Sequence, residues 1–402
     1  MGSVGLGWLG LLALLSVGCV GDKVENVRRD GDGPDASTTG GARHSPGPRD
    51  QAPNFDAYDA VLEAFIGKRG LAGATTAVVH RDLGVVHVAG YGAFDAERVS
   101  FIASSSKILS VGVLMRLMDQ GLVDVDAPIG TYLEAAFGDG GDDKEYLTLA
   151  QLLSNSSGLP GLADEALFGL YACQFQEAGT LLDCARDIYT TTDDDAWRSE
   201  PDTMFRYGGG QWQLSGGIAE VASGKTWAEL VHATYAEPCG VASLGYANQT
   251  ERAGTDYPDY FDQDPSNLAG FDNPYVEAGA YIAPEDYGKI LLMHLRGGRC
   301  GDERVLSPES VARMQEDRVA EWGGITADPM FKGYGMGWWI DRDHPGVVVD
   351  GGAYGAVAWL DNARGYGAII IFEAAITFAT PGLNHMAIAA TKPELDAVFD
   401  AL

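Results

Sequence analysis

A serine and a lysine stand three residues apart at the start of a strongly apolar segment. Ser104 and Lys107 belong to the run SSSK at positions 104–107, and residues 108–118 are mostly apolar, which is typical of a helix buried nearly all round. Side chains three residues apart share one helix face, so only Ser104 of the three serines is placed to meet Lys107. Burial would lower the pKa of the lysine and let it act as a base toward the serine. The free N–H groups at the helix start would stabilise an oxyanion. The alternative is a serine cap beside a surface lysine.

Other catalytic signatures are missing from the sequence. It contains no G-x-S-x-G turn, no G-x-x-x-x-G-K-[ST] phosphate loop and no H-E-x-x-H helix. Of the seven histidines, only His80 and His87 lie within ten residues of each other, and they fall on different predicted strands. The acidic run from Asp139 to Glu145 lacks the spacing of an EF-hand calcium loop. We therefore expect neither a metal site nor a cofactor.

Further segments are spaced along the chain like the landmarks of a known family. Residues 147–160 read LTLAQLLSNSSGLP, with Asn155 near the middle, and residues 204–225 read MFRYGGGQWQLSGGIAEVASGK, with Tyr207 and Gly209 near the start. Similar landmarks occur at residues 278–292, 305–307 and 333–338, and at Asp350-Gly351-Gly352.

From about Tyr58 to Glu373 the chain resembles the serine β-lactamase-related family, which includes class C β-lactamases, DD-peptidases and esterases. The resemblance implies that Ser104 is the nucleophile and that Lys107 is its lysine. It also implies that Tyr207 is the tyrosine of the Tyr-x-Asn motif, which passes a proton between Lys107 and either Ser104 or the leaving group. The neighbouring ammonium would lower the pKa of the phenol. The alternative for Tyr207 is a packed ring with a satisfied hydroxyl.

Asn155 stands where histidine is commoner in the family, and two further departures matter more for the substrate. Gly209 stands where asparagine is expected, and Asp350 stands where a lysine or histidine is usual. The asparagine would bind a substrate amide and the cation would attract the carboxylate of a β-lactam or of D-Ala-D-Ala, so both losses favour uncharged esters. Gly351 and Gly352 still allow a strand to approach the site, and the N–H of Ala353 is the expected second oxyanion donor. Asp350 could equally face away from the substrate. A β-lactamase, a DD-carboxypeptidase and a catalytically silent penicillin-binding-like protein remain the alternatives to an esterase.

The elements that must position these residues are predicted mainly at the two ends of the chain. Apolar spacing predicts one helix from Phe55 to Phe65 and another from Pro393 to Leu402. Five strands are predicted, over residues 75–80, 85–89, 346–349, 356–360 and 367–372. The pattern predicts one α/β domain over residues 54–402, in which sheet parts at about 54–100 and 335–402 flank a mostly helical lobe at about 101–334. The resemblance implies a five-stranded antiparallel sheet flanked by helices, as in β-lactamases and penicillin-binding proteins.

The overall charge limits the range of partners. Acidic residues outnumber basic residues by 57 to 27, for a formal net charge of −30. This charge repels phosphate backbones and anionic lipid headgroups, so nucleic acid is excluded as a partner. With 46% of its residues hydrophobic, the chain can still form a sizeable core. The expected partner is a small-molecule ester or amide substrate.

The first 19 residues predict an export signal. Residues 4–18 are almost wholly apolar but too few to span a bilayer, which is typical of a signal h-region. The sequence LSVGC at residues 15–19 resembles a bacterial lipobox that would lipidate Cys19, and an ordinary cleaved signal is the alternative. Membrane contact is expected only through that anchor. Residues 20–53 are rich in Gly, Pro, Asp and Arg, which predicts a disordered linker.

The cysteine count fits export to the periplasm or cell envelope. Setting Cys19 aside leaves four cysteines, an even number suited to an oxidising compartment. Four cysteines allow three pairings, of which we favour Cys173 with Cys184 and Cys239 with Cys300.

Overall fold

The computed structural model describes the chain from residue 52 onward, with gaps. The described residues are 52–164, 166–248, 257–258, 264–268, 271–319, 332–375 and 382–402. The predicted export signal, Cys19 and all but the last two residues of the predicted linker lie outside them. Within the described residues, no helix is both long enough and apolar enough to span a bilayer.

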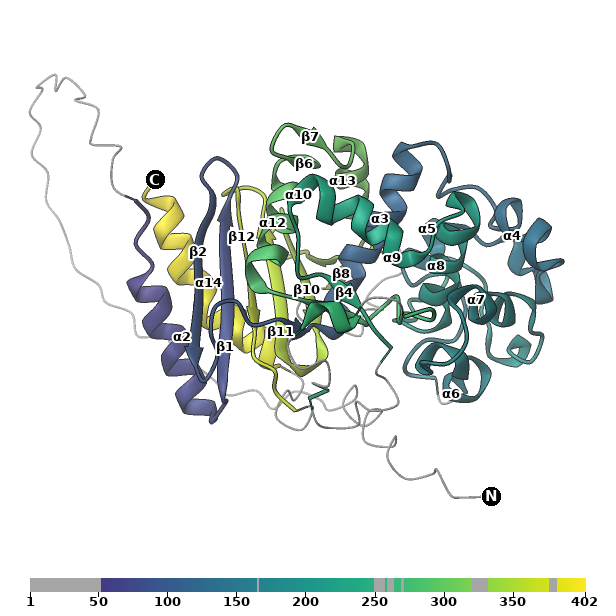
Figure 1. The fold of residues 1–402 in the computed structure, drawn as a ribbon, viewed down its shortest axis with the longest axis horizontal. Coiled ribbons are helices and arrows are strands. Elements are labelled where there is room, and N and C mark those ends of the chain that lie inside the picture. The colour runs from purple at the N-terminus through teal and green to yellow at the C-terminus, as the bar shows by residue number, and fades with distance from the viewer. Residues whose placement is uncertain are drawn as a thin grey trace, which may run out of the picture.

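A seven-stranded antiparallel sheet organises the fold (Figure 1). Its strand order is β2-β1-β12-β11-β10-β9-β8. The strands are β1 (Gly73–His80), β2 (Gly84–Gly92), β8 (Lys332–Tyr334), β9 (Trp339–Asp341), β10 (Val347–Gly352), β11 (Ala356–Asp361) and β12 (Tyr366–Ile371). The N-terminal hairpin joins the C-terminal strands because β1 pairs with β12, with Thr75 opposite Ile371 and His80 opposite Tyr366.

All five predicted strands are present, and the sheet gains two more. The additional strands, β8 and β9, have three residues each, which is too short for a period-two pattern to stand out in the sequence. Strand β10 also runs on to Gly352, beyond the predicted end at Val349, so Asp350, Gly351 and Gly352 belong to the sheet.

Helices cover both faces of this sheet. α2 (Asp56–Arg69) and α14 (Leu383–Asp400) pack on one face, and α12 (Pro284–Leu295) packs against β1 and β12 on the other (Figure 1). Strand β1 is therefore buried on both sides, with Val78 in the core under α2 and Ala77 and Val79 in the core under α12. Because α12 comes from the range predicted as the helical lobe, that lobe is only partly separate from the sheet.

The C-terminal helix begins earlier than predicted. It starts at Leu383, and Pro393 lies inside it rather than at its first turn. A proline lacks the N–H that an internal helical position normally donates, so its place inside the helix has a local cost. Leu395 and Phe399 are buried in the core beyond the proline, so tertiary packing of both halves outweighs its local cost.

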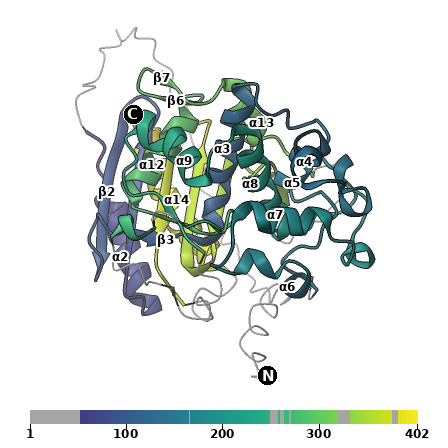
Figure 2. The ribbon, with the colours of Figure 1, turned by 45° about the vertical axis from the view of Figure 1, so that its right-hand side comes forward.

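Most of the remaining helices form a lobe beside the sheet (Figure 2). They are α4 (Gly130–Phe137), α5 (Leu149–Leu153), α6 (Leu167–Leu170), α7 (Leu181–Thr190), α8 (Gly210–Ser223), α9 (Trp227–Val231), α10 (Glu237–Cys239) and α13 (Pro308–Met314). Helix α3 (Lys107–Asp119) lies between the sheet and the lobe, and ten of its thirteen residues are buried, as its apolar sequence predicted.

Short strands connect this central helix to distant segments. β3 (Ser100–Phe101) pairs with β5 (Ala280–Ile282), which also pairs with β4 (Gly245–Tyr246). A separate small sheet is formed by β6 (Arg299–Cys300) and β7 (Glu303–Arg304). In the first pair, Ser100 lies opposite Ile282. This pairing brings the residues just before β5 next to the start of α3.

Candidate active site

Ser104 and Lys107 meet at the start of α3. Residues Ala103–Ser106 form a 3-10 turn that continues into the α-helix at Lys107. The Nζ atom of Lys107, which is fully buried, donates a hydrogen bond of 3.2 Å to Ser104 Oγ. Ala103, directly before the serine, has a φ of 47°, a left-handed conformation that non-glycine residues seldom adopt. Such local strain is concentrated at functional sites.

The two other serines of the run point elsewhere. Ser106 Oγ donates to the carbonyl of Ala103 at 2.6 Å and accepts the N–H of Ala280 at 2.9 Å. Ser105 Oγ donates to the carbonyl of Asp350 at 3.4 Å. These bonds fix the turn between β5 and β10, and they leave Ser104 as the serine that faces Lys107, as the spacing predicted.

Lys107 forms a buried ion pair that the sequence did not reveal. Its Nζ atom lies 3.0 Å from Glu277 Oε2, and neither side chain is exposed to solvent. Burial lowers the pKa of Lys107, but the Glu277 carboxylate and other neighbours outweigh it and raise that pKa above 10.5. The expectation that burial would leave Lys107 with a lowered pKa is therefore wrong, because the carboxylate of Glu277 lies beside the ammonium.

Tyr207 completes the group around the nucleophile. Its hydroxyl lies close enough to Ser104 for the serine to affect the pKa of the phenol, and Lys107 Nζ lies 4.5 Å from the centre of its ring. The ring stacks on Trp339, with 5.3 Å between ring centres. Burial raises the pKa of the phenol, and although the nearby ammonium acts in the opposite direction, the net shift is upward. The expected lowering of the Tyr207 pKa is therefore wrong as a net direction.

Gly209 has no room for the side chain that the family pattern expects. Its φ is 92°, and a Cβ atom there would come 2.5 Å from the carbonyl oxygen of Pro160. Its N–H donates to Glu277 Oε1 at 3.1 Å. Position 209 therefore contributes a backbone donor that holds Glu277.

The carboxyl group of Asp350 is buried beneath the nucleophile turn. Its side chain has no solvent exposure, and Tyr287 donates a hydroxyl hydrogen bond of 3.3 Å to Oδ2. Burial raises the pKa of Asp350 well above its ordinary range, although Lys107 opposes the shift. An Asp350 that repels a substrate carboxylate would be ionised and would face the substrate. In the structure its side chain instead points from β10 into the protein, toward α3.

The two glycines after Asp350 face opposite sides of β10. A Cβ at Gly351 would meet the side chain of Asn384 at 3.0 Å, whereas a Cβ at Gly352 would lie 2.0 Å from the carbonyl oxygen of Ile102. Only glycine at position 352 therefore lets the strand approach the nucleophile turn this closely. Ala353, the expected second oxyanion donor, begins the next turn directly after this contact.

A buried asparagine supports the turn that carries Tyr207. Asn155, which is buried and has a φ of 57°, accepts hydrogen bonds through Oδ1 from Gly208 N at 3.0 Å and from Trp212 Nε1 at 2.9 Å. The sequence drew attention to Asn155 only as a departure from the usual histidine. For Glu277, the available signal was a single acidic residue inside the apolar run YVEAGAYI, directly before a family landmark.

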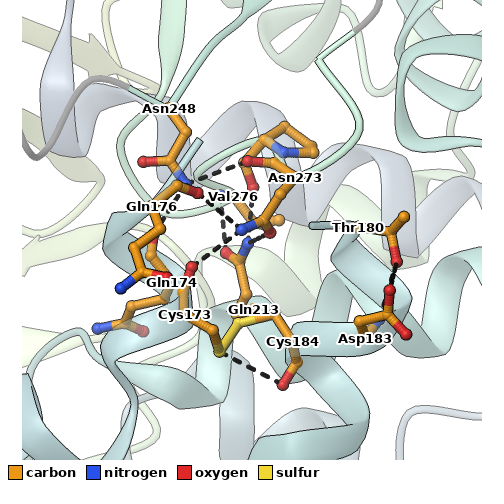
Figure 3. Close-up of a disulfide and its surroundings, with 11 residues drawn as sticks. Cys173, Gln174, Gln176, Thr180, Asp183, Cys184, Gln213, Asn248, Asn273 and Val276 are labelled. Carbon is orange, nitrogen blue, oxygen red and sulfur yellow. Dashed lines mark hydrogen bonds between the residues drawn. A yellow bond between two sulfur atoms is a disulfide. The ribbon is translucent and has the colours of Figure 1, made fainter. Parts of the chain in front are cut away.

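Both expected disulfides are formed. Cys173 is bonded to Cys184, and Cys239 is bonded to Cys300. The first bond closes a loop beside the segment that leads to Glu277 (Figure 3). Asn273 Nδ2 of that segment donates to the carbonyl of Cys173 at 2.9 Å. Disulfides of this kind are consistent with an exported protein.

The described residues offer no obvious place for a metal ion. Across them, no group of three or more His, Cys, Asp and Glu side chains is arranged to hold one.

Comparisons with known proteins identify relatives of similar sequence or fold. A curated relative, "Penicillin-binding protein 4" of Amycolatopsis lactamdurans, is 27% identical over 303 residues, which cover 73% of this chain and 74% of the relative. A putative β-lactamase from Bacteroides dorei has a similar structure, with a TM-score of 0.65, 22% identity, and coverage of 87% of this chain and 99% of that one. EstCE1, a hydrolase with promiscuous acyltransferase activity, has a TM-score of 0.66 and 18% identity, with coverage of 84% and 97%.

A sequence model of the Beta-lactamase family matches residues 58–391, which is most of the chain. This match includes the nucleophile turn, the Tyr207 turn and strand β10. The chain therefore belongs to the β-lactamase family and is a serine hydrolase by class.

Proposed function

We propose that this chain is an exported serine hydrolase that cleaves uncharged carboxylic esters through an acyl-enzyme on Ser104. The observation that carries the proposal is the hydrogen bond of 3.2 Å between Lys107 Nζ and Ser104 Oγ, with the ring of Tyr207 4.5 Å from the same ammonium. A nucleophile with two adjacent proton carriers is the arrangement that acyl transfer requires.

The reaction would proceed in two half-reactions on this group. Ser104 Oγ attacks the ester carbonyl and loses its proton to the neighbouring carriers, while the carbonyl electrons move onto oxygen. The backbone N–H groups of Ser104 and Ala353 would donate to that oxyanion. Collapse of the intermediate expels the alcohol, which takes a proton from Tyr207. Water then repeats the sequence on the acyl-enzyme and releases the acid.

The preference for uncharged esters rests on the charges around Ser104. Gly209 supplies no amide to a substrate, and position 350 supplies no cation. The Lys107 ammonium is already paired with Glu277. Among these residues, no positive charge is left to attract a substrate carboxylate. An anionic β-lactam therefore gains less binding free energy at this site than a neutral ester does. The acyltransferase activity in the description of EstCE1 supports an acyl-enzyme that can be intercepted by other acceptors.

Two readings compete with an esterase. The curated relative is named as a penicillin-binding protein, which favours a β-lactam or peptide substrate, while the departures at Gly209 and Asp350 are also compatible with a catalytically silent protein. Intact-mass measurement after treatment with a fluorophosphonate, and in parallel with a labelled penicillin, separates all three. An esterase forms the first adduct only, a penicillin-binding enzyme forms both, and a silent protein forms neither.

The same measurement tests the nucleophile. Ser104→Ala should abolish the fluorophosphonate adduct, whereas the matched control Ser105→Ala, which removes a hydroxyl facing β10, should retain it. An adduct that survives in Ser104→Ala would reject Ser104.

Export and lipid attachment at Cys19 complete the proposal. The two disulfides and the apolar N-terminal segment support export. Mass analysis of membrane and soluble fractions would test the anchor, and Cys19→Ser should release the protein from the membrane. An unmodified N-terminal peptide that retains residues 1–19 would contradict it.

A further inference from the structure

The carboxylate of Glu277 takes a central place beside Lys107. Lys107 Nζ lies 3.0 Å from Glu277 Oε2 and also donates to the backbone carbonyl of Glu277 at 3.3 Å. Both side chains are fully buried, so solvent does not weaken their interaction. One residue therefore presents two oxygen atoms to the ammonium that faces Ser104.

Position 209, where the family pattern has an asparagine, cannot carry a side chain in this structure. A Cβ atom there would lie 2.5 Å from the carbonyl oxygen of Pro160. The N–H of Gly209 instead binds Glu277 Oε1. A charged carboxylate from a distant segment thus stands in for a neutral amide from the Tyr207 turn.

Glu277 is held in a fixed orientation. Tyr275 donates its hydroxyl to Oε1 at 2.6 Å, in addition to the bond from Gly209. The segment around Glu277 is tied to α3, because Ser110 Oγ donates to the carbonyl of Val276 at 2.6 Å. On the other side, Gln213 Oε1 accepts the N–H of Val276 at 3.2 Å (Figure 3).

Other ionisable groups also face this pair. Tyr207 and Asp350 both act on Lys107, and Tyr334 and Tyr275 lie close enough to Glu277 for its charge to raise their pKa values. Glu277 is the strongest of the neighbours that favour the charged form of Lys107. It is also the one that forms an ion pair with the lysine.

We propose, on the basis of the hydrolase function proposed above, that Glu277 is a positioning residue that keeps Lys107 an ammonium in the resting enzyme and accepts a proton from it during attack. As the Ser104 Oγ–C bond forms, the serine O–H bond breaks and its proton moves to Lys107 Nζ. An N–H bond of Lys107 breaks at the same time, and its proton moves to Glu277. When the alcohol leaves, it takes a proton from Tyr207, which is restored from Lys107 and then from Glu277. The protons and charges return to their starting places.

The variant Glu277→Gln tests this relay. Because Gly209 and Tyr275 both donate to Oε1, the amide oxygen of glutamine should occupy that position and its NH₂ group should face Lys107 Nζ. The NH₂ group of the glutamine and the Lys107 ammonium are then both hydrogen-bond donors, and they repel each other unless the lysine loses a proton. The titration of Lys107 should therefore move to lower pH by at least about one unit.

Lysine ¹⁵N NMR measures that titration directly, with the Lys107 signal assigned by its loss in Lys107→Arg. The wild type should keep the Lys107 ammonium at least as far into the alkaline range as an ordinary lysine does. Glu285→Gln, which removes a carboxylate paired with Lys289 at 3.9 Å on the surface of α12, is the matched control and should leave the Lys107 signal unchanged. An unchanged titration in Glu277→Gln overturns the proposal. If that variant does not fold, a wild-type Lys107 that loses its proton below about pH 9 overturns it as well.

Ester turnover gives the second readout. At pH 7, kcat/KM of Glu277→Gln for p-nitrophenyl acetate should fall by about 10² and recover partly at alkaline pH, because a neutral lysine must now take the serine proton alone. An equal loss at every pH would indicate a purely structural role and reject the relay. If the wild type neither hydrolyses esters nor reacts with fluorophosphonate, the proposed function fails, while the NMR titration still decides whether Glu277 controls Lys107.

Discussion

At the scale of single residues, burial and charge act against each other on the groups around Ser104. Burial alone favours a neutral lysine, yet the Glu277 carboxylate raises the pKa of Lys107. Burial also raises the pKa of Tyr207, and the ammonium offsets only part of that shift. The resting site therefore pairs a charged lysine with a neutral phenol. Neither is a ready base at neutral pH, so activation of the serine depends on moving a proton through the group.

Removal of either proton carrier should slow turnover severely. We expect Lys107→Ala and Tyr207→Phe each to lower kcat on p-nitrophenyl acetate by about 10² or more, which is what a positioned acid or base normally contributes. The exposed residues Lys68 and Tyr146 provide matched controls, and Lys68→Ala and Tyr146→Phe should turn over ester normally. Near-normal kcat in both site variants would mean that another group moves the proton.

The buried carboxyl of Asp350 should make stability depend on pH. Its pKa is raised in the folded protein, so the folded state holds the proton more tightly than the unfolded state. The free energy of unfolding therefore falls as pH rises above about 3.8, where an unfolded aspartate ionises, toward the folded pKa. Asp350→Asn removes this loss of stability. In urea unfolding, the free energy of unfolding of the variant minus that of the wild type should therefore be larger at pH 8 than at pH 4. The same difference at both pH values would show that ionisation of Asp350 is not costly.

At the scale of elements, local patterns could be predicted and long-range contacts could not. Ser104 and Lys107 share one turn, so their spacing alone predicts that they meet. Glu277 lies 170 positions from Lys107 and reaches it because β3 pairs with β5, which no periodicity near either residue encodes. The pKa direction of Lys107 differs from the prediction because its carboxylate partner lies far along the chain, whereas that of Tyr207 differs because burial outweighs the effect of the expected ammonium. Three-residue strands such as β8 are likewise too short for alternation to mark them.

The close contact between β10 and the nucleophile turn can be tested with a pair of neighbouring glycines. Gly352→Ala would place a Cβ 2.0 Å from the Ile102 carbonyl, so strand and turn must move apart and the Ala353 N–H must shift with them. We expect kcat to fall by about 10² or more, the scale of losing one oxyanion donor. Gly351→Ala meets only the end of the Asn384 side chain at 3.0 Å, which can rotate away, and it should cost much less. Equal effects of the two substitutions on ester turnover would argue against an oxyanion role for this strand.

At the scale of the whole molecule, the sheet joins the two ends of the chain and the helices cover it on both sides. The nucleophile helix α3 lies between this sheet and the lobe, and the groups around the nucleophile turn come from four segments: α3 itself, the Tyr207 turn, the loop before β5 and strand β10. Site geometry therefore depends on the global fold. Conditions that loosen the packing between sheet and lobe should impair activity before the secondary structure is lost.

Packing against the sheet includes a histidine whose titration should limit stability in acid. His294 on α12 is fully buried beside Trp338, and neither of its ring nitrogens has a hydrogen-bond partner within the described residues. Burial lowers its pKa from 6.5 to about 4. The folded state therefore binds this proton less tightly than the unfolded state does, and the stabilisation by the neutral ring is fully present above pH 6.5 and is lost as pH falls toward 4.

The expected loss is about 1.4 kcal/mol per pH unit over that window, or roughly 3 kcal/mol in total. His294→Leu removes the titration, so the free energy of unfolding of this variant should fall less steeply between pH 6.5 and 4, whatever its absolute stability. His344, whose side chain is 74% exposed, provides the matched control, and His344→Gln should keep the wild-type slope. Urea unfolding followed by circular dichroism across this pH range measures both slopes. If His294→Leu keeps the full slope, the acid sensitivity arises elsewhere and the buried ring does not govern it.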